Sequence, residues 1–201
     1  PGLLGDHVEA ALHALRPMNA AGLLECIVID NSSRDRTAEI VSCCAWPRLV
    51  RSDQNLGYGR ALNVGLGSVS TPHVLLMNPD VVIEGDSILA LSRFLDDHAE
   101  AALVGPRIQR GDGTTQPAGL LPTPWLYVAR AAGLGRTAGQ QRAVRRGEGP
   151  FQTDWISGAV MLARTDVLRA LGGFDPRFFL YFEETDLCRR VLDAGRELWV
   201  L

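Results

Sequence analysis

The sequence predicts an α/β protein with a mostly parallel sheet and helices on both of its faces. Two observations support this fold class. Helical and strand-like segments alternate through residues 1–106, at the lengths of β-α-β units. Two polar clusters, at residues 30–32 and 78–80, each follow an apolar strand-like run. Because ligands bind outside the carboxyl ends of strands in such sheets, we expect both clusters to face one crevice.

The first half of the chain contains most of the predicted strands. Apolar residues at helical spacing predict a helix over residues 8–15, which Pro17 ends. A buried strand is expected over 23–29, and the polar cluster after it can cap a helix around 38–41. The remaining elements are a strand at 48–51, a helix at 57–69, a strand at 74–77, a helix at 87–94 and a strand at 101–104.

The second half has a different pattern. The letters QRGDGTT at 109–115 indicate a hairpin, and residues 117–150, rich in Gly, Pro and Arg, indicate a long loop or a helix pair. A strand is expected at 156–163, followed by a short helix that begins at Thr165 and stops at Gly172. A last helix covers 183–194 and ends at Gly195.

Composition excludes several classes of protein. The net charge of −3 gives no general attraction to nucleic acid, and no apolar run reaches the ~18–20 residues of a membrane span. The four cysteines show no metal-ligand spacing, so we expect free thiols in a reducing compartment. The chain begins without Met and ends inside a strand-like segment, and we expect a fragment shortened at both ends.

Two motifs follow the first two strands. In VIDNSSRDRT, Asp30 and Asn31 stand at a predicted strand end, where they either hydrogen-bond a base or ribose or cap the next helix. In NLGYGRALNVGL, Asn55 and Gly57 precede a helix whose backbone N–H groups can approach a ligand; a tight packing loop is the alternative.

The stretch LLMNPDVVIE places Asn78 and Asp80 on either side of a proline. One interpretation is an ordinary turn. The other is a carboxylate at a strand end that holds Mg²⁺ or Mn²⁺, since these ions take oxygen ligands and are often coordinated by substrate phosphates as well as by the protein.

An acidic segment, FFLYFEETDLCRR, begins the last helix. Acidic residues favour a helix N-terminus, which is the structural interpretation of Glu183, Glu184 and Asp186. Against a wall of aromatic residues, however, the pKa of at least one carboxyl should rise, and a general base needs this. In WISGAVML just upstream, Trp155 either stacks on a sugar ring or belongs to the core.

Together and in this order, these motifs resemble the family 2 inverting glycosyltransferases of the GT-A fold, in particular the rhamnosyltransferase-like branch. The resemblance covers most of residues 24–190, with 117–150 unmatched. It implies transfer of a sugar to an acceptor hydroxyl with inversion, in cell-surface polysaccharide synthesis, and the branch suggests dTDP-rhamnose as the donor. It also implies one catalytic domain over 1–201, with a nucleotide-binding half (1–106) and an acceptor-binding half (107–201).

The resemblance assigns roles residue by residue. The nucleotide-sugar site would comprise Asp30, Asn31, Asn55, Gly57 and Asn78; the metal would lie on Asp80; the acceptor side would comprise Trp155, Gly158 and Glu183; and Glu184 would be the catalytic base, with Asp186 as the second candidate. Asn78 and Glu184 stand where the family carries Asp. The family also begins with a strand in the middle of the sheet, which we expect to be missing here.

The expected partners are a nucleotide-sugar donor, a divalent cation (Mg²⁺ or Mn²⁺) and a glycan or lipid-linked glycan acceptor. No nucleic acid is expected. We expect a cytoplasmic protein at the inner face of the plasma membrane, with peripheral membrane contact through the arginines of 130–146 or with that segment simply solvated. Two other functions stay open: a nucleotidyltransferase that makes nucleotide-sugars, and a non-catalytic nucleotide- or sugar-binding module.

Overall fold

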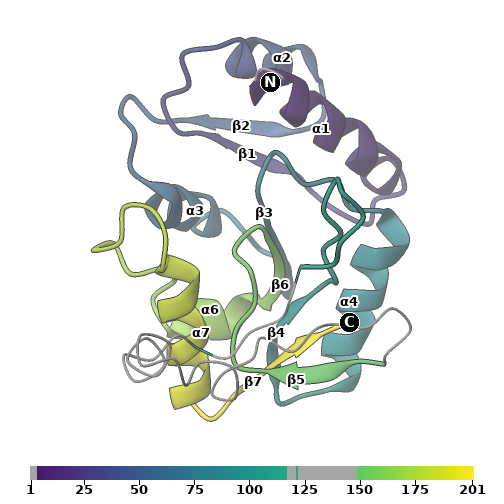
Figure 1. Ribbon diagram of the computed structural model, residues 1–201. Coiled ribbons are helices and arrows are strands. Elements are labelled where there is room, and N and C mark those ends of the chain that lie inside the picture. Colours follow the sequence, from purple (N-terminus) through teal and green to yellow (C-terminus); the bar gives the residue numbers. More distant parts are fainter. Residues whose placement is uncertain (1–3, 117–120, 122–148) are drawn as a thin grey trace.

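Helices and strands alternate along the part of the chain that the structure, a computed structural model, describes: residues 4–116, 121 and 149–201 (Figure 1). The elements are α1 (Leu4–Ala20), β1 (Ile27–Asp30), α2 (Thr37–Cys43), β2 (Arg48–Arg51), α3 (Tyr58–Leu66), β3 (His73–Met77), α4 (Gly85–Asp97), β4 (Ala101–Gly105), β5 (Phe151–Thr153), β6 (Val160–Arg164), α6 (Thr165–Ala170), α7 (Glu183–Asp193) and β7 (Glu197–Val200). The predicted loop at 117–150 lies almost wholly outside the described residues.

The strands form two separately hydrogen-bonded sheets. β1 and β2 make a parallel pair, and the second sheet has the order β3-β6-β4-β7-β5. In this second sheet only β4 and β7 are parallel, while β6 runs antiparallel to β3 and β4, and β5 antiparallel to β7. The sheet is mixed, but the expectation of mostly parallel pairing needs correction, because two strands from the second half of the chain, β5 and β6, run opposite to their neighbours.

The antiparallel pairing of β3 with β6 has a consequence for the site. Met77, the last residue of β3, pairs with Val160, the first residue of β6. The backbone continues the ladder one step further, since the Asn78 N–H donates to the Ala159 carbonyl at 2.8 Å. The segment before β6 therefore lies beside the polar cluster that follows β3, although the two are about eighty residues apart in sequence.

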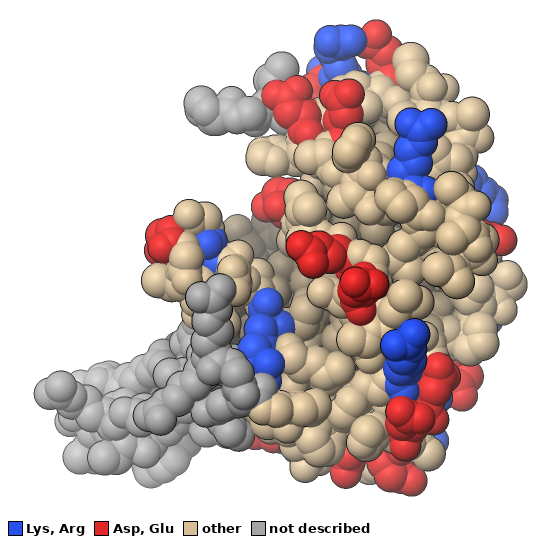
Figure 2. Space-filling view, turned by 90° about the vertical axis from the view of Figure 1, so that its right-hand side faces the viewer, with Lys and Arg blue, Asp and Glu red and all other residues tan. Residues whose placement is uncertain are grey.

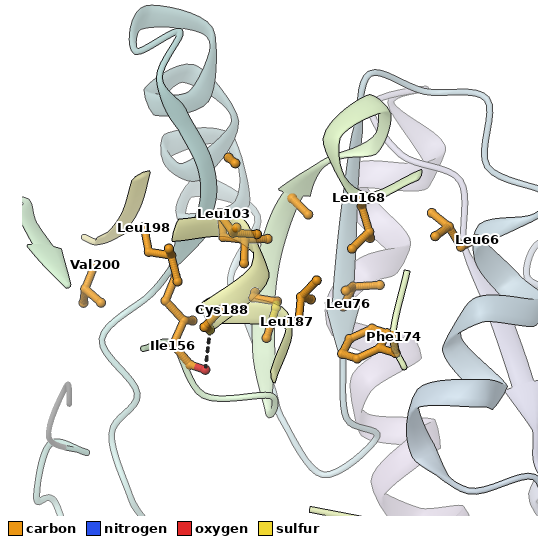
Figure 3. Close-up of a cluster of buried hydrophobic side chains, with 14 of the residues drawn as sticks. Leu66, Leu76, Leu103, Ile156, Leu168, Phe174, Leu187, Cys188, Leu198 and Val200 are labelled. Carbon is orange, nitrogen blue, oxygen red and sulfur yellow. Dashed lines mark hydrogen bonds between the residues drawn. The ribbon is translucent and has the colours of Figure 1, made fainter. Parts of the chain in front are cut away.

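Helices cover both faces of the five-stranded sheet, as the sequence predicts. Alternate strand residues point to opposite faces, so Leu103 and Met161 pack toward α6 and α7, whereas Val104 and Leu162 pack toward α4. Figure 3 shows the first of these layers, in which Leu103, Leu168, Leu187 and Leu198 converge from four elements.

The small β1–β2 sheet is also covered on both sides. Val28 packs with the buried residues Val8, Leu12 and Val41 of α1 and α2. On the opposite face, Gly65 of α3 lies so close to Ile29 that an added Cβ would stand 3.2 Å from the isoleucine side chain. α1 joins the two sheets, because its Leu15 and Met18 belong to the cluster under α4.

Two predicted elements need correction. α1 does not end before Pro17: it runs from Leu4 to Ala20 with Pro17 inside it. The apolar face explains this, because Met18 beyond the proline is as buried as Leu15 before it, and burial of that face offsets the missing hydrogen bond. The strand expected at 156–163 begins only at Val160, and β5 before it was not predicted, because three residues are too few to show a period.

Smaller expectations are confirmed. Gln109 and Thr115 form an antiparallel bridge across the predicted hairpin. All four cysteines are free thiols. Burial raises the pKa of Cys26 to about 11 and that of Cys188 to about 12, so both stay protonated at neutral pH. Within the described ranges, none of the helices combines the length and apolar character needed to cross a membrane.

Candidate active site

Asp30, the last residue of β1, is held by the chain itself. Its side chain is only 1% exposed. One carboxylate oxygen accepts the Ser33 N–H at 2.8 Å, and the other accepts the Arg51 Nε–H at 3.2 Å. Asp30 therefore fixes the turn after β1 and orients the exposed guanidinium of Arg51, a residue that the sequence did not single out.

The next residue, Asn31, ties this turn to the Gly-rich segment before α3. Its Nδ2 donates to Asn55 Oδ1 at 3.0 Å and to the Gly57 carbonyl at 3.2 Å, while its Oδ1 accepts the Leu56 N–H at 2.8 Å. Asn55 Oδ1 also accepts the Gly57 N–H at 2.9 Å. Asn31, Asn55 and Gly57, predicted from two separate motifs, thus form one network of hydrogen bonds.

Gly57 is required by its surroundings. It adopts φ +84° and ψ 168°, a conformation almost confined to glycine. An added Cβ would stand 2.4 Å from the Phe179 carbonyl oxygen, and the following Tyr58 N–H donates to that same oxygen at 3.0 Å. The network at the end of β1 is therefore in contact with the segment that precedes α7.

The cluster after β3 is a turn with an exposed carboxylate. The Val81 N–H donates to the Asn78 carbonyl at 3.2 Å, which closes the turn, and Asp80 is exposed. The Oδ1 atom of Asn78 is buried without a hydrogen-bond partner among the described residues. The segment is therefore a turn that presents an exposed Asp80 at the end of a strand, and a cation on Asp80 stays a prediction.

Tyr58, which the sequence analysis did not select, connects these segments. Its hydroxyl donates to the Gly158 carbonyl at 2.7 Å. Burial raises the pKa of this phenol well above its ordinary value, and the negative charges of Glu183, Glu184 and Asp80 add to the rise. Carboxylates from the end of β3 and from the start of α7 are therefore both near enough to this hydroxyl group to raise its pKa. The sequence feature that could have identified Tyr58 is its position directly after Gly57, a predicted ligand-binding residue.

The two adjacent glutamates at the start of α7 have different environments. Glu183 is 4% exposed, and its Oε2 has no hydrogen-bond partner in the part of the chain described here. Burial raises the pKa of Glu183, and the charge of Glu184 adds to the rise. Glu184 is half-buried and lies against Gly158, where an added Cβ would stand 3.2 Å from the Glu184 Cβ.

Trp155 contacts the acidic segment through its indole N–H. This group donates to Thr185 Oγ1 at 3.1 Å, and the Thr185 hydroxyl lies 3.5 Å from Glu184 Oε1. The Trp155 ring also packs against the core cluster under α7. Thr185 is a second residue that the sequence analysis did not select. The contacts recorded for Trp155 are structural, and stacking on a sugar stays a prediction.

Asp186 is engaged differently from Glu184. Its Oδ2 accepts the Arg190 Nε–H at 2.7 Å, one helical turn further along α7. The other guanidinium nitrogens of Arg190 donate to the carbonyls of Leu171 and Gly173. Asp186 thus takes part in anchoring α7 to the end of α6, whereas no basic partner of Glu184 occurs in the described ranges.

A divalent cation fits at the end of β3 as an ion shared with a substrate. In the described ranges no group of at least three His, Cys, Asp or Glu residues could hold a metal alone. Asp80 would supply one exposed carboxylate, and the buried Asn78 Oδ1, which has no hydrogen-bond partner among the residues described, would be a second oxygen. A donor set of this kind suits Mg²⁺ or Mn²⁺, which keep waters and bind substrate phosphates.

The chain is similar in sequence to known proteins. The model of the family described as glycosyl transferase family 2 matches residues 5–154. The N-acetylglucosaminyl-diphospho-decaprenol L-rhamnosyltransferase of Mycobacterium tuberculosis is 30% identical over an alignment that covers 95% of this chain and 68% of that enzyme.

Two solved structures share the fold. GalNAc-T7 with UDP, GalNAc and Mn²⁺ has a TM-score of 0.71 at 13% identity, over 95% of this chain and 39% of that one. The mannosyltransferase PcManGT of Pyrobaculum calidifontis with GDP-Man and Mn²⁺ has a TM-score of 0.67 at 17% identity, over 98% of this chain and 53% of that one. These likenesses confirm the expected GT-A architecture.

Proposed function

Because this chain belongs to glycosyl transferase family 2, we propose that it transfers a sugar from a nucleoside-diphosphate donor to an acceptor hydroxyl, with inversion at the anomeric carbon. One observation carries the proposal: the end of β3, which carries Asp80, is hydrogen-bonded through Asn78 to Ala159, and the neighbouring Gly158 lies against Glu184 at the start of α7. Sugar transfer needs both a group that neutralises a departing diphosphate and a base for the acceptor, and this region supplies one of each.

The donor side is assigned to the end of β1 and the segment before α3. Asp30 and Asn31 would contact the pyrimidine and ribose, with Asn55 and Gly57 lining the same pocket. The hydrogen bonds of Asn31 to Asn55 and Gly57 support this assignment, because they hold the pocket in place before a ligand arrives. Since both carboxylate oxygens of Asp30 are used within the chain, its contribution would come largely through the turn and Arg51.

The cation is assigned to Asp80, with Asn78 as an oxygen donor beside it. When bound there, Mg²⁺ or Mn²⁺ would neutralise negative charge on the donor diphosphate as it leaves. The buried Oδ1 of Asn78 supports the assignment, because it has no partner in the part of the chain that the structure describes and such an atom needs one. The two structural neighbours, each determined with Mn²⁺, are consistent with it.

The catalytic base is assigned to Glu184. Its carboxylate takes the proton of the acceptor hydroxyl while the oxygen forms a bond to the anomeric carbon, and the bond from that carbon to the diphosphate breaks on the opposite face. A single displacement of this kind inverts the configuration. Glu184 is preferred over Asp186 because the Asp186 carboxylate is held by Arg190.

The acceptor side is assigned to Trp155, Gly158 and Glu183. Gly158 lies against Glu184, Glu183 directly precedes Glu184, and Trp155 donates to Thr185, which directly follows Glu184. The donor residues fall in residues 1–106 and the acceptor residues in 107–201, in line with the proposed nucleotide-binding and acceptor-binding halves. For substrates, the name of the mycobacterial relative suggests L-rhamnose as the transferred sugar and a polyprenyl diphosphate-linked sugar as the acceptor. The donor would then be dTDP-rhamnose. A lipid-linked acceptor would place the protein at the inner face of the plasma membrane, in polysaccharide synthesis.

Thermal-shift titration of the full-length protein tests the donor and cation sites. UDP, dTDP and GDP sugars are added with and without Mn²⁺ to the wild type, to Asp80→Ala and to Asp97→Ala, which removes an exposed acid from the end of α4. We expect Mn²⁺-dependent stabilisation by one nucleotide class, lost in Asp80→Ala and kept in Asp97→Ala. A folded protein that no nucleotide stabilises would overturn the proposal.

Turnover separates an enzyme from a binding module. With the nucleotide-sugar identified by titration and an acceptor-containing lipid extract, we expect release of nucleoside diphosphate by the wild type and a loss of at least about a hundredfold in Glu184→Gln. Nucleotide binding without turnover would favour the non-catalytic alternative. If Asp186→Asn loses activity and Glu184→Gln keeps it, the base is assigned to the wrong residue.

A further inference from the structure

Four consecutive large apolar side chains are exposed directly before α7. The exposed fractions are 58% for Phe179, 54% for Leu180, 70% for Tyr181 and 54% for Phe182. We call this segment, residues 179–182, the apolar loop. Single exposed apolar residues are ordinary on protein surfaces, but a contiguous group of this size marks a surface that meets another apolar phase.

The backbone holds the apolar loop in this position. Tyr181 and Phe182 both adopt φ +69°, a left-handed conformation that is strained for aromatic residues. At one end the Phe179 carbonyl accepts the Tyr58 N–H at 3.0 Å, and at the other the Phe182 carbonyl accepts the Asp186 N–H at 2.9 Å. The exposed side chains are therefore presented by a fixed loop, which Figure 1 shows projecting away from α3 and α7.

The base of the loop carries exposed arginines. Arg60 of α3 donates from Nε to the Pro176 carbonyl at 2.7 Å and has no acidic partner in the described ranges. Arg177 is largely exposed and paired with Asp175. An apolar tip with guanidinium groups at its base suits the boundary between hydrocarbon and phosphate head groups. The face drawn in Figure 2, by contrast, carries acidic and basic side chains interspersed with one another.

The loop is continuous with the proposed catalytic base. Phe182 directly precedes Glu183 and is the N-cap residue of α7, and Glu184 follows one residue later. Whatever covers the apolar loop therefore lies at the acceptor side of the site. The proposed acceptor is a sugar on a polyprenyl diphosphate, whose lipid part resides in a membrane.

We propose that the apolar loop docks on the surface of a lipid bilayer and holds Glu184 at the level of the acceptor's sugar head group. The inference rests on the lipid-linked acceptor of the proposed function and adds to it the element that contacts the membrane. It assigns this contact to residues 179–182 and not to the arginines of 130–146.

Flotation of the full-length protein with vesicles made from equal parts of phosphatidylcholine and phosphatidylglycerol tests the proposal. The test variant is Leu180→Ser combined with Tyr181→Ser. Its control is Leu23→Ser, which removes a leucine of similar exposure (58%) between α1 and β1, at the opposite end of β1 from the site. Stabilisation by nucleotide with Mn²⁺ shows that each variant is folded.

We expect the wild type and Leu23→Ser to float with the vesicles and the double variant to lose at least about tenfold in partitioning, because two large side chains no longer enter the bilayer. A wild type that does not float, or a double variant that floats equally well, would overturn the proposal. So would a dimer in gel filtration that the double variant dissociates, since a second copy would then cover the loop. Flotation without any nucleotide binding would instead count against the proposed function and leave the docking surface in place.

Discussion

At the scale of single residues, the two adjacent glutamates at the start of α7 have different roles because their side chains have different surroundings. Glu183 points into the interior and Glu184 lies half-exposed beside Gly158. Because burial penalises the charged form, the pKa of Glu183 is raised. Its carboxylate is therefore a source of instability at neutral pH, and the fold keeps it directly next to the proposed base.

Glu183→Gln should stabilise the ligand-free protein in a pH-dependent way. A carboxyl with a raised pKa in the folded state contributes its full stability below the ordinary value of about 4.5, and this contribution is lost as pH rises through the folded value. Glutamine cannot ionise, so its advantage should be small near pH 4.5 and grow toward pH 7. We expect the melting temperature at pH 7 to rise by about 2–4 °C, which corresponds to ~1 kcal/mol at this size.

Melting curves of both proteins between these pH values measure the effect. Glu184→Gln serves as the comparison, because that carboxyl is half-exposed and should show a smaller change. A Glu183→Gln protein that is less stable than the wild type at pH 7 would mean that the carboxylate has a partner that stabilises its charge.

Thr185→Val should slow catalysis without weakening donor binding. The Thr185 hydroxyl accepts the Trp155 indole N–H and lies within reach of Glu184 Oε1, so it orients the proposed base. Valine keeps the shape and removes the hydroxyl. Losing one such hydrogen bond should lower kcat about three- to tenfold, with KM for the donor unchanged. Thr185→Ser retains the hydroxyl and should recover most of the activity; equal losses in both variants would indicate a packing role.

The sequence predicted the positions of these residues better than their partners. Asn31, Asn55 and Gly57 were expected near one ligand from separate motifs, and the structure joins them by hydrogen bonds. The connecting groups, Tyr58 and Thr185, were missed because their roles depend on distant residues. Tyr58 bonds Gly158, a hundred residues further along the chain, and Thr185 bonds Trp155, thirty residues before it. Spacing within a motif carries no information on such long-range contacts.

At the scale of elements, the start of α3 depends on one glycine. Gly57 has a positive φ and meets the Phe179 carbonyl oxygen, whereas Gly22 has a positive φ of +70° with no other group within 4 Å of an added Cβ. A comparison of Gly22 with Gly57 therefore distinguishes the free-energy cost of the left-handed backbone from the additional cost of a steric collision.

Gly57→Ala should therefore destabilise the protein more than Gly22→Ala. We expect a loss of about 1 kcal/mol for Gly22→Ala from the left-handed conformation, and roughly 2–4 kcal/mol for Gly57→Ala, where the collision adds to it. Gly57→Ala should also lose stabilisation by nucleotide, since residue 57, which is hydrogen-bonded to Asn55 and Asn31, must move away from Phe179. Chemical denaturation measures the free energy of unfolding of both variants. Equal losses would mean that the segment before α7 moves away from residue 57 without a measurable free-energy cost.

The element boundaries show what local patterns can and cannot predict. Strongly periodic helices such as α4 and α7 were predicted to within a few residues. The helix end expected at Pro17 was wrong, because burial of Met18 outweighs the local preference of proline. The pattern also could not predict strand direction, because an apolar run looks the same in a parallel and in an antiparallel strand. The sequence therefore predicted the strand β6 but not its orientation in the sheet.

At the scale of the whole molecule, the two halves of the sequence are interleaved. β6 from the second half lies between β3 and β4 from the first, and β7 pairs with β4. Asn63 of α3 further exchanges two hydrogen bonds with the backbone of Phe174. A nucleotide-binding and an acceptor-binding half can thus differ in function while sharing one sheet and one core.

The β1–β2 sheet is less buried than the centre of the five-stranded sheet. Its strands have four residues each and are mostly half-exposed, whereas every residue of β4 is buried. The proposed donor site spans from the end of β1 to Asp80 after β3, that is, from the small sheet to the large one. A bound nucleotide-sugar should therefore connect the two sheets and suppress local opening of the smaller one.

Hydrogen exchange of the full-length protein, followed by mass spectrometry, tests this coupling. With nucleotide-sugar and Mn²⁺ at about a hundred times the dissociation constant, openings that abolish binding should become rarer by up to ~2.7 kcal/mol, or about a hundredfold. We expect this protection in peptides covering β1, β2 and residues 52–57, with little change in β4. Asp80→Ala should remove it. Protection confined to residues 78–81 would mean that the ligand binds the end of β3 alone and leaves the two sheets uncoupled.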